Sequence, residues 1–431
     1  MKEIIKTILY SWKSRELPKI IGRDIDLSEY STLKPQKIIA ISGFRRSGKT
    51  YLLLHLIKEL LKNNPKEKVV YLNFEDERIP LKTEFLTATI PTIKEVFGEP
   101  NFLFLDEIQV IDNWSKWLRR VYDSEQNIRF FVTGSNSKLS GDELPTELRG
   151  RFLEVHVFPL SFREFLRFKE VVADLKEIDH SENERSKIIK NFNEYLEYGG
   201  LPEVVLSPES KKLELVQNYY NTVVKKDIIE KSKVRNEEGM KALLRLLLNS
   251  THYTISKTYN TLKSLNYEIG KTTIQEYISH IESSYFLYSL PILSNKAKDE
   301  MQYPRKIYCI DNSFLLFMSS KFSKNKGRLY ENLVFVELKR RSKNIAYWLS
   351  KQKEEVDFVV FDGFKTKQLI QVSVDLDDPD TKKRETRALL KASKELKCNN
   401  LLVITEDLEK EEKIKGKKIK YTPLWKWLLV K

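Results

Sequence analysis

Short apolar runs that end in small or acidic residues recur along the first third of the chain. They cover residues 37–42, 101–105 and 129–132, and a leucine-rich segment of good helix formers, residues 51–63, follows the first run. Strand-length apolar runs that alternate with helical segments are typical of a parallel sheet covered by helices. The pattern therefore predicts an α/β domain at the start of the chain.

Helical periodicity dominates the middle of the chain. Residues 163–233 are charged and helical in period, with an aromatic-rich face that suits a helical lid. A buried helix is expected at residues 243–248 and a second one, capped by Ser256, at residues 256–265. A third helix is expected to open with a capping box between Thr272 and Gln275. This outline is that of a helix–turn–helix.

Strand and helix patterns return in the last third of the chain. Residues 327–341 have a helical pattern, and residues 345–349, 355–361 and 369–374 have the apolar character of strands. A second α/β domain is expected here.

The composition of the chain indicates which partners and which cellular compartment to expect. The 431 residues carry 75 lysines and arginines against 61 acids, a formal charge of +14, which favours a polyanionic partner such as nucleic acid. A lysine-rich, thermophile-like composition would give the same excess without one. The two cysteines form no CxxC pair, the five histidines show no zinc spacing, and no apolar run could span a bilayer. We expect a soluble cytoplasmic protein without a membrane partner.

The strongest motif lies between the first apolar run and the helix after it. Residues 43–50 read GFRRSGKT and match GxxxxGK[ST], the phosphate-binding loop, in the strand–loop–helix context that the motif requires. Lys49 would neutralise the β- and γ-phosphates of ATP, and Thr50 would ligate Mg²⁺. The residues expected to contact the nucleotide are Gly43, Arg46, Ser47, Gly48, Lys49, Thr50 and Tyr51.

A second motif completes a hydrolytic site. The apolar run 101–105 ends in Asp106 and Glu107, which is the Walker B pattern. Asp106 would hold Mg²⁺ through water, and Glu107 would orient the water that attacks the γ-phosphate. The alternative is an exposed acidic strand end.

Two further places in the sequence suit an ATPase. Thr133 and Asn136 end a buried strand where a sensor of the γ-phosphate would lie. Arg149 or Arg151 could reach the nucleotide of a neighbouring subunit as an arginine finger, which predicts a homo-oligomer, although either could form an ordinary surface ion pair.

The motifs together resemble a family of archaeal and bacterial AAA+ ATPases with a C-terminal restriction-endonuclease-like domain. The resemblance rests on GFRRSGKT, YLNFEDER (71–78), FLDEIQ (104–109), FVTGSNS, LRGRF and PLSFREF (159–165), and extends through RLYENLVFVELKRR and EEVDFVVF to the terminal PLWKWLL. It implies a five-stranded parallel AAA+ sheet, ATP hydrolysis and DNA transactions. We expect the chain to divide into an ATPase core at 1–165, a helical lid at 166–235, a winged-helix module at 236–300 and a nuclease-fold domain at 301–431. The GGLP turn at residues 199–202 also looks like the glycine-proline motif of signal-transducing relatives, in which Pro202 would press on adenine.

Two of these modules, the winged helix and the nuclease fold, are candidates for contact with DNA. If the second helix of the helix–turn–helix entered a major groove, the side chains within reach would be Lys271, Thr272, Thr273 and Gln275. The alternative is a module used only for packing or subunit contact.

The C-terminal layout looks like PD-(D/E)XK, the metal-dependent nuclease pattern. Glu331 matches the helix acid and Asp357 the first strand acid, but the (D/E)XK element reads Gln371-Val372-Ser373. Gln371 can still ligate a metal through its carbonyl oxygen, whereas Ser373 cannot replace the charge of the lysine. Lys351 or Lys353 could substitute, and a degenerate nuclease fold is the favoured interpretation.

The sequence thus predicts an AAA+ ATPase, with ATP and Mg²⁺ as cofactors, that moves DNA-binding and nuclease-like modules. Two rivals stay open. One is an ATP-dependent signal switch that assembles partners without DNA, and the other is an ATP-gated DNA nuclease.

Overall fold

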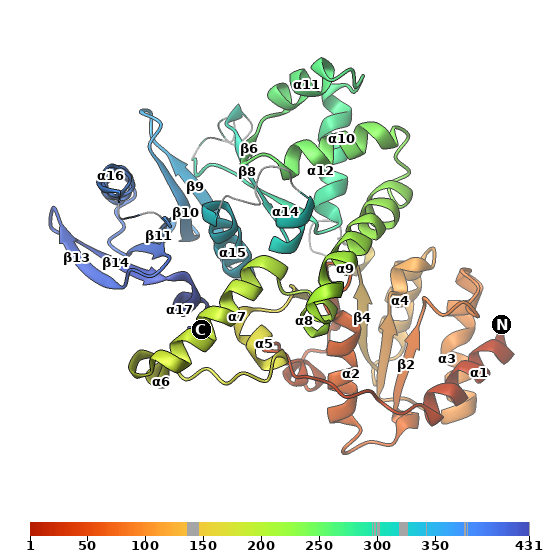
Figure 1. Cartoon of the computed structure of the whole chain (residues 1–431). Coiled ribbons are helices and arrows are strands. Elements are labelled where there is room, and N and C mark those ends of the chain that lie inside the picture. Colours follow the sequence, from red (N-terminus) through yellow and green to blue (C-terminus); the bar gives the residue numbers. More distant parts are fainter. Residues whose placement is uncertain are drawn as a thin grey trace. The chain divides into compact units, whose positions relative to one another are not determined.

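The computed structural model describes residues 1–135, 146–294, 296, 299, 302–318, 326–341, 343–374, 376 and 378–430. The chain forms two compact units, Met1–Val157 and Phe158–Lys431 (Figure 1).

The first unit is built on a five-stranded parallel sheet of order β2-β3-β4-β1-β5. Its strands are β1 (Ile38–Gly43), β2 (Val69–Asn73), β3 (Phe102–Asp106), β4 (Arg129–Gly134) and β5 (Phe152–Val157). Its α-helices are α1 (Lys2–Ser14), α2 (Lys49–Leu60), α3 (Thr83–Phe97) and α4 (Trp114–Ser124). The expected parallel α/β sheet is confirmed.

Both faces of this sheet are buried, as its near-continuous apolar strands require. Alternate residues of β1 point to opposite faces, so that Ile38 joins one core with Phe85 of α3, whereas Ile39 joins the other with Leu53 of α2. Because all five strands run in the same direction, the residues that follow β1, β3 and β4 meet at one edge of the sheet.

The second unit begins with the expected helical region. It contains α5 (Phe162–Phe168), α6 (Leu175–His180), α7 (Glu182–Tyr198), α8 (Pro202–Leu206), α9 (Glu209–Thr222) and the π-helix η6 (Val223–Glu230). A capping box at α5 joins Ser161 and Glu164, and each side chain bonds to the backbone N–H of the other.

A three-helix segment with a small antiparallel sheet follows. Its elements are α10 (Glu237–Leu248), β6 (His252–Tyr253), α11 (Ile255–Ser264), α12 (Lys271–Ser283), β7 (Leu287–Leu290) and β8 (Arg305–Cys309), and the sheet order is β6-β8-β7. Helix α14 (Asn312–Met318) comes next.

Two predicted caps in this segment are wrong. The N-cap of α11 is Thr254, whose hydroxyl accepts a hydrogen bond from the N–H of Lys257, so Ser256 lies inside the helix. Helix α12 begins at Lys271 after Gly270 and has no side-chain cap. Thr272 therefore lies within the first turn, where its hydroxyl is not placed to cap the helix, and the capping box with Gln275 does not form.

A mixed six-stranded sheet of order β13-β14-β12-β11-β10-β9 completes the second unit. The elements are α15 (Lys326–Arg340), β9 (Asn344–Leu349), β10 (Glu355–Asp362), β11 (Lys365–Val372), α16 (Pro379–Glu395), β12 (Leu401–Thr405), β13 (Lys410–Ile414), β14 (Lys417–Pro423) and α17 (Leu424–Leu429). Strands β11, β12 and β14 are parallel, and the other pairs are antiparallel. A search of the described residues for a helix with the length and apolarity to cross a membrane finds none.

Candidate functional site

The loop between β1 and α2 is shaped by backbone conformations that favour glycine. Gly43 and Gly48 have φ angles of 145° and 98°, and a Cβ on Gly43 would lie 2.2 Å from the carbonyl oxygen of Val157. The buried ammonium of Lys49 donates to the carbonyl oxygens of Gly43 at 3.1 Å and Phe44 at 3.2 Å. The loop therefore curls around a cation at the N-terminus of α2, which is the arrangement that a phosphate requires.

Asp106 ends β3 at the same edge of the sheet. Its carboxylate accepts hydrogen bonds from the hydroxyls of Tyr71, at 2.7 Å, and Thr133, and Thr50 also bonds to it. Burial raises the pKa of Asp106 despite these bonds. A buried carboxylate beside the Thr50 hydroxyl presents the hard oxygen donors that Mg²⁺ prefers, so this pair fits the metal.

Glu107 follows Asp106 in a left-handed conformation, with φ of 54°. Its N–H donates to Thr133 Oγ1 at 2.8 Å, and its carboxylate accepts from the N–H of Ser135 at 3.2 Å and lies 3.7 Å from Lys49 Nζ. Burial acts to raise the pKa of Glu107, but the charge of Lys49 and the hydrogen bonds that its carboxylate accepts from Gln109 and Ser135 lower the pKa overall. Glu107 is therefore held ionised, as an acceptor of a proton from water must be.

The remaining loop candidates differ in their surroundings. Arg46 has a φ of 66° within the loop, and Tyr51 is exposed on the first turn of α2. Arg23 donates to the carbonyl oxygen of Ser47 at 2.9 Å, a contact that sequence analysis missed because Arg23 belongs to no motif. Asn136 lies outside the described residues.

The two candidate finger arginines lie just before β5. Arg151 makes a double contact with Asp123 of α4, at 2.9 and 3.2 Å, whereas Arg149 is exposed. The contact of Arg151 is the ordinary ion pair that sequence analysis kept as the alternative.

The GGLP turn is held within the second unit. Pro202 is the first residue of α8. Gly200 donates from its N–H to Asp311 Oδ2 at 2.7 Å and accepts from the N–H of Leu160 at 2.7 Å. Burial raises the pKa of Asp311.

The four candidate DNA contacts lie together at the start of α12. Lys271, Thr272 and Gln275 are exposed, and Thr273 is half-buried. Ile274, Tyr277 and Ile278 bury the opposite side of the helix. The exposed residues could therefore meet a partner without unpacking the helix.

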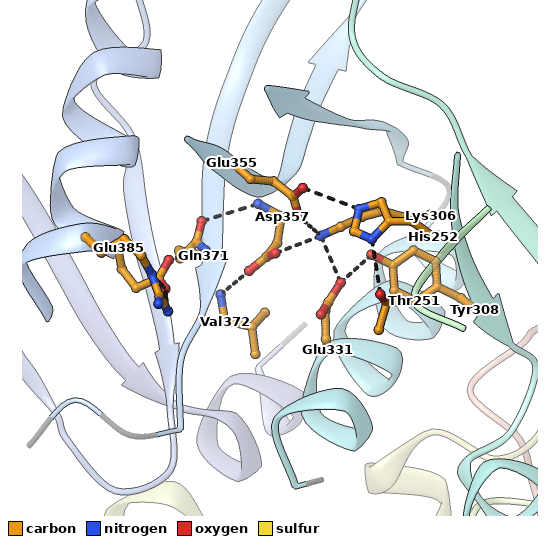
Figure 2. Close-up of polar contacts among 11 residues, drawn as sticks. Thr251, His252, Lys306, Tyr308, Glu331, Glu355, Asp357, Gln371, Val372 and Glu385 are labelled. Carbon is orange, nitrogen blue, oxygen red and sulfur yellow. Dashed lines mark hydrogen bonds and ion pairs between the residues drawn. The ribbon is translucent and has the colours of Figure 1, made fainter. Parts of the chain in front are cut away.

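Two of the C-terminal candidates, Glu331 and Asp357, come together around a lysine that sequence analysis missed (Figure 2). Lys306 of β8 places Nζ 3.0 Å from Glu331 of α15, 2.7 Å from Glu355 and 2.8 Å from Asp357 of β10. Tyr308 donates to Glu331 at 2.7 Å, and His252 Nε2 lies 3.3 Å from Glu355. The signal in the sequence is slight, because Lys306 follows Arg305 at the start of β8, before the apolar residues 307–309.

Gln371 of β11 forms hydrogen bonds with the neighbouring strand β10 and with α16 rather than with Lys306. Its Oε1 accepts the N–H of Asp357 at 3.3 Å, and its Nε2 donates to Glu385 of α16. Lys351 and Lys353, the substitutes considered for the missing lysine, are exposed. The described residues contain no group of three or more His, Cys, Asp or Glu side chains placed to hold a metal ion.

The sheet order, the loop and the paired acids define a P-loop protein of the AAA class, for which nucleotide binding is the implied property. Residues 35–166 match the family described as AAA domain, residues 189–325 a domain of unknown function (DUF8612) and residues 326–427 another domain of unknown function (DUF4143). The chain is 38% identical to the uncharacterized protein MJ1544 of Methanocaldococcus jannaschii, over 98% of this chain and 94% of that protein. It therefore belongs to the family of AAA-domain proteins that this archaeal relative represents.

A second relative and two solved structures extend the comparison. An uncharacterized protein of Haemophilus influenzae is 28% identical over 94% of this chain and 98% of its own length. The Walker-type ATPase paby2304 of Pyrococcus abyssi matches 70% of this chain and 99% of its own, with 16% identity and a TM-score of 0.46. The Orc1 protein of Aeropyrum pernix, solved in complex with DNA, matches 73% of this chain and 90% of its own, with 11% identity and a TM-score of 0.33.

Proposed function

We propose that this protein hydrolyses ATP to ADP and phosphate and uses the reaction to rearrange DNA-binding and nuclease-like modules. The observation that carries the hydrolysis is the meeting of Lys49, Asp106 and Glu107 at one edge of the parallel sheet. Phosphoryl transfer is catalysed mainly by positioning and charge stabilisation, and these side chains supply both.

Each residue has a separate part in the proposed reaction. Lys49 leaves the carbonyl oxygens that it now contacts and binds the β- and γ-phosphates. Thr50 and Asp106 hold Mg²⁺, which neutralises charge on the phosphates when bound. Glu107 accepts a hydrogen bond from the attacking water and aligns it with the γ-phosphate. Thr133 keeps Asp106 and Glu107 in register, because its hydroxyl bonds to both residues.

The DNA-binding part of the proposal rests on the formal charge of +14 and on the exposed start of α12. Lys271, Thr272, Thr273 and Gln275 are the proposed contacts, within the winged-helix module at residues 236–300. The core at 1–165, the lid at 166–235 and the nuclease-fold domain at 301–431 complete the proposed division. The rival, a nucleotide switch that assembles partners without DNA, uses the same ATP site.

The C-terminal domain is proposed to lack nuclease activity of its own. Asp357 and Gln371 lie on adjacent strands, as in the PD-(D/E)XK pattern, but Ser373 stands where the pattern has lysine. Loss of one electrostatic group of this kind costs roughly 10²–10³-fold in rate. Cleavage of DNA that needs Mg²⁺ and disappears in Asp357→Ala would instead establish the gated-nuclease rival.

The decisive experiment measures the ATPase rate of the full chain alone and with single-stranded, duplex and junction DNA. We expect Mg²⁺-dependent hydrolysis that DNA stimulates, with DNA binding that weakens steeply as salt rises. The Glu107→Gln protein controls for contaminating ATPases. A rate that no DNA alters, together with absent DNA binding at low salt, would favour the switch, and no hydrolysis at all would refute the ATPase assignment.

A further inference from the structure

A basic hollow lies between the end of α16 and the β13–β14 hairpin, elements that are neighbours in Figure 1. Its volume is about 460 Å³. Four lysines and three uncharged residues line it: Lys394, Lys397, Lys415, Lys417, Leu390, Ser393 and Asn399. Within the part of the chain that the structure describes, none of the lining residues is acidic. A hollow lined in this way concentrates positive charge and suits an anionic partner.

The lysines of the hollow differ from other lysines of the same elements, because they have no acidic partner. On α16, Lys391 lies 2.6 Å from Glu354, and on β14, Lys418 lies 2.5 Å from Glu411. Among the described residues, no carboxylate is at ion-pair distance from the lysines of the hollow, which are Lys394, Lys397, Lys415 and Lys417. Their charges are therefore left for a partner outside the chain.

Two of these lysines adopt a backbone conformation that favours other residues. Lys397 and Lys415 have φ angles of 52° and 49°, in the left-handed region that glycine and asparagine enter more readily. Lys415 and Gly416 form the turn of the β13–β14 hairpin, a place where asparagine before glycine is favoured. The local backbone thus does not account for lysine at these positions, whereas a charge directed at the hollow does.

The hollow is at the opposite end of the C-terminal sheet from Asp357. The far end of β10, at Asp362, pairs with Lys365 at the start of β11. The side chain of Asn400, next to the hollow, donates to the carbonyl oxygen of Lys367 at 3.3 Å. At roughly 3.3 Å per residue, the strand from Asp357 to Asp362 spans about 16 Å. The hollow is therefore separate from the acids of the nuclease-like pattern.

An exposed aromatic ring lies at this same end of the sheet. Phe364, in the turn between β10 and β11, is the most exposed large apolar side chain of the described residues. Lys365 and Lys367 are exposed beside it, and Asp362 lies 3.5 Å from Lys367. Proteins that hold single-stranded nucleic acid combine such rings, on which bases stack, with cations that contact the phosphates.

We propose that this end of the C-terminal sheet binds single-stranded DNA. The lysines of the hollow contact the phosphates, and Phe364 stacks on an unpaired base. A single strand fits better than a duplex, because the bases of a duplex are already stacked on one another and offer Phe364 no free face within the helix. The inference rests on the proposed contact with DNA, but it depends neither on ATP hydrolysis nor on the contacts of α12.

The test of the hollow is the salt dependence of binding. Fluorescence anisotropy follows the binding of labelled oligothymidine to the full chain over a range of salt concentrations. Lys397→Gln with Lys415→Gln should lower the affinity roughly 10- to 100-fold at about 50 mM salt. The slope of log K against log salt should become shallower by about 1.4, because each phosphate contact of a single strand contributes about 0.7.

The matched control removes two charges from the other face of the same hairpin. Lys418 and Lys420 alternate along β14 with Lys417, so their side chains point away from the hollow. Lys418→Gln with Lys420→Gln should therefore leave both the affinity and the slope close to wild type. All the side chains substituted in the two pairs are exposed, and circular dichroism checks that each variant is folded.

Phe364 is tested by the shape of the side chain rather than by salt. Phe364→Ala should weaken oligothymidine binding roughly 5- to 100-fold and leave the salt slope unchanged, since it removes a stacked ring and no charge. Phe364→Leu should be as weak as Phe364→Ala, whereas Phe364→Trp should restore binding. Oligothymidine should also bind more tightly than a duplex of the same length.

Three results would overturn the proposal. The first is oligothymidine binding that Lys397→Gln with Lys415→Gln leaves unchanged, or that the control pair lowers equally. The second is binding that only Lys271→Gln abolishes, which would keep DNA at α12 and exclude it here. The third is binding of phosphatidylserine vesicles in place of oligothymidine, retained by Phe364→Leu, which would assign the surface to a membrane. The ATPase rate without DNA is measured in parallel, so failure of this surface and failure of the ATPase assignment are separate results.

Discussion

Lys49 and Glu107 contact each other in the proposed ATP site, but substitution should separate their roles. Lys49→Ala removes the buried cation that the loop encloses. Because a charge-assisted hydrogen bond contributes about 1.5–3 kcal/mol, ATP affinity should fall roughly 10- to 100-fold, and turnover should be lost. Fluorescent-nucleotide titration and phosphate release measure the two effects. If Lys49→Ala hydrolysed ATP at the wild-type rate, Lys49 would have no part in the reaction.

Glu107→Gln should keep ATP binding and lose turnover, whereas Lys49→Ala should lose both. The amide keeps the size of the side chain and leaves Asp106 and Thr50 intact for Mg²⁺, so ATP should bind with near wild-type affinity. Loss of the ionised acceptor should slow hydrolysis roughly 10²- to 10⁴-fold. Equilibrium binding and single-turnover measurements on one preparation test this, and a large loss of affinity would mean that Glu107 helps to hold the metal.

Glu355 should make the stability of the second unit sensitive to acid. Burial acts to raise its pKa, but the hydrogen bond with His252 and the charge of Lys306 lower the pKa to about 2. A lowered folded-state pKa adds stability above the ordinary value of about 4.5, and this stability is lost as the pH falls toward 2. Between these values, wild type should lose on the order of 2–3 kcal/mol more unfolding free energy than Glu355→Gln. Urea unfolding across this range measures it, with the exposed Glu411→Gln as control, and parallel curves for wild type and Glu355→Gln would contradict it.

At the scale of elements, the GGLP turn depends on close backbone contact. A Cβ on Gly200 would lie 2.4 Å from the carbonyl oxygen of Leu160, and that contact is formed by backbone on both sides. Gly200→Ala should therefore destabilise the second unit by roughly 2 kcal/mol or more. Gly270→Ser is the control, because a Cβ at Gly270 meets nothing within 4 Å and serine is a favoured N-cap. Equal midpoints of thermal unfolding for Gly200→Ala and Gly270→Ser would show that the GGLP turn accommodates the added Cβ.

At the scale of the whole molecule, the open question is whether one chain completes the ATP site of another. If Arg151 acts as a finger, it must leave Asp123, so Arg151→Ala should lower the ATPase rate roughly 10³- to 10⁵-fold. Asp123→Asn is the matched control, because it breaks the same ion pair and keeps the arginine. The rate per chain should rise with protein concentration, and Arg149→Ala decides between the two candidates. If the ATPase rate does not depend on protein concentration, and if Arg151→Ala and Asp123→Asn reduce it equally, then the Arg151–Asp123 ion pair has only a structural role.

The proposed ATP site rests on local motifs that can be recognised in the sequence. Gly43, Lys49 and Thr50 lie within one eight-residue loop, and Asp106 and Glu107 end one apolar strand, so short motifs contained both halves of the site. Parallel strands bring such ends to one edge, and the predicted sheet was enough to place the halves together. The caps of α11 and α12 were mispredicted because several neighbouring polar residues could fill the same N-terminal position, and only the backbone of the folded chain selects one.

Tertiary structure alone decided the C-terminal site and the setting of the GGLP turn. Asp357 and Glu331 were predictable because helix and strand patterns reveal them, but Lys306 lies on another strand, 51 positions from Asp357 in sequence. Asp311, likewise, meets Gly200 across 111 positions. The periodicity of a sequence does not show which distant cation will pair with a buried acid. That partner is set by the packing of β8 against β10 and α15. It is also set by the need to neutralise a charge that is buried away from water. Sequence by itself thus determined the class of nucleotide site, whereas the fold determined which cation the acids of the C-terminal domain enclose.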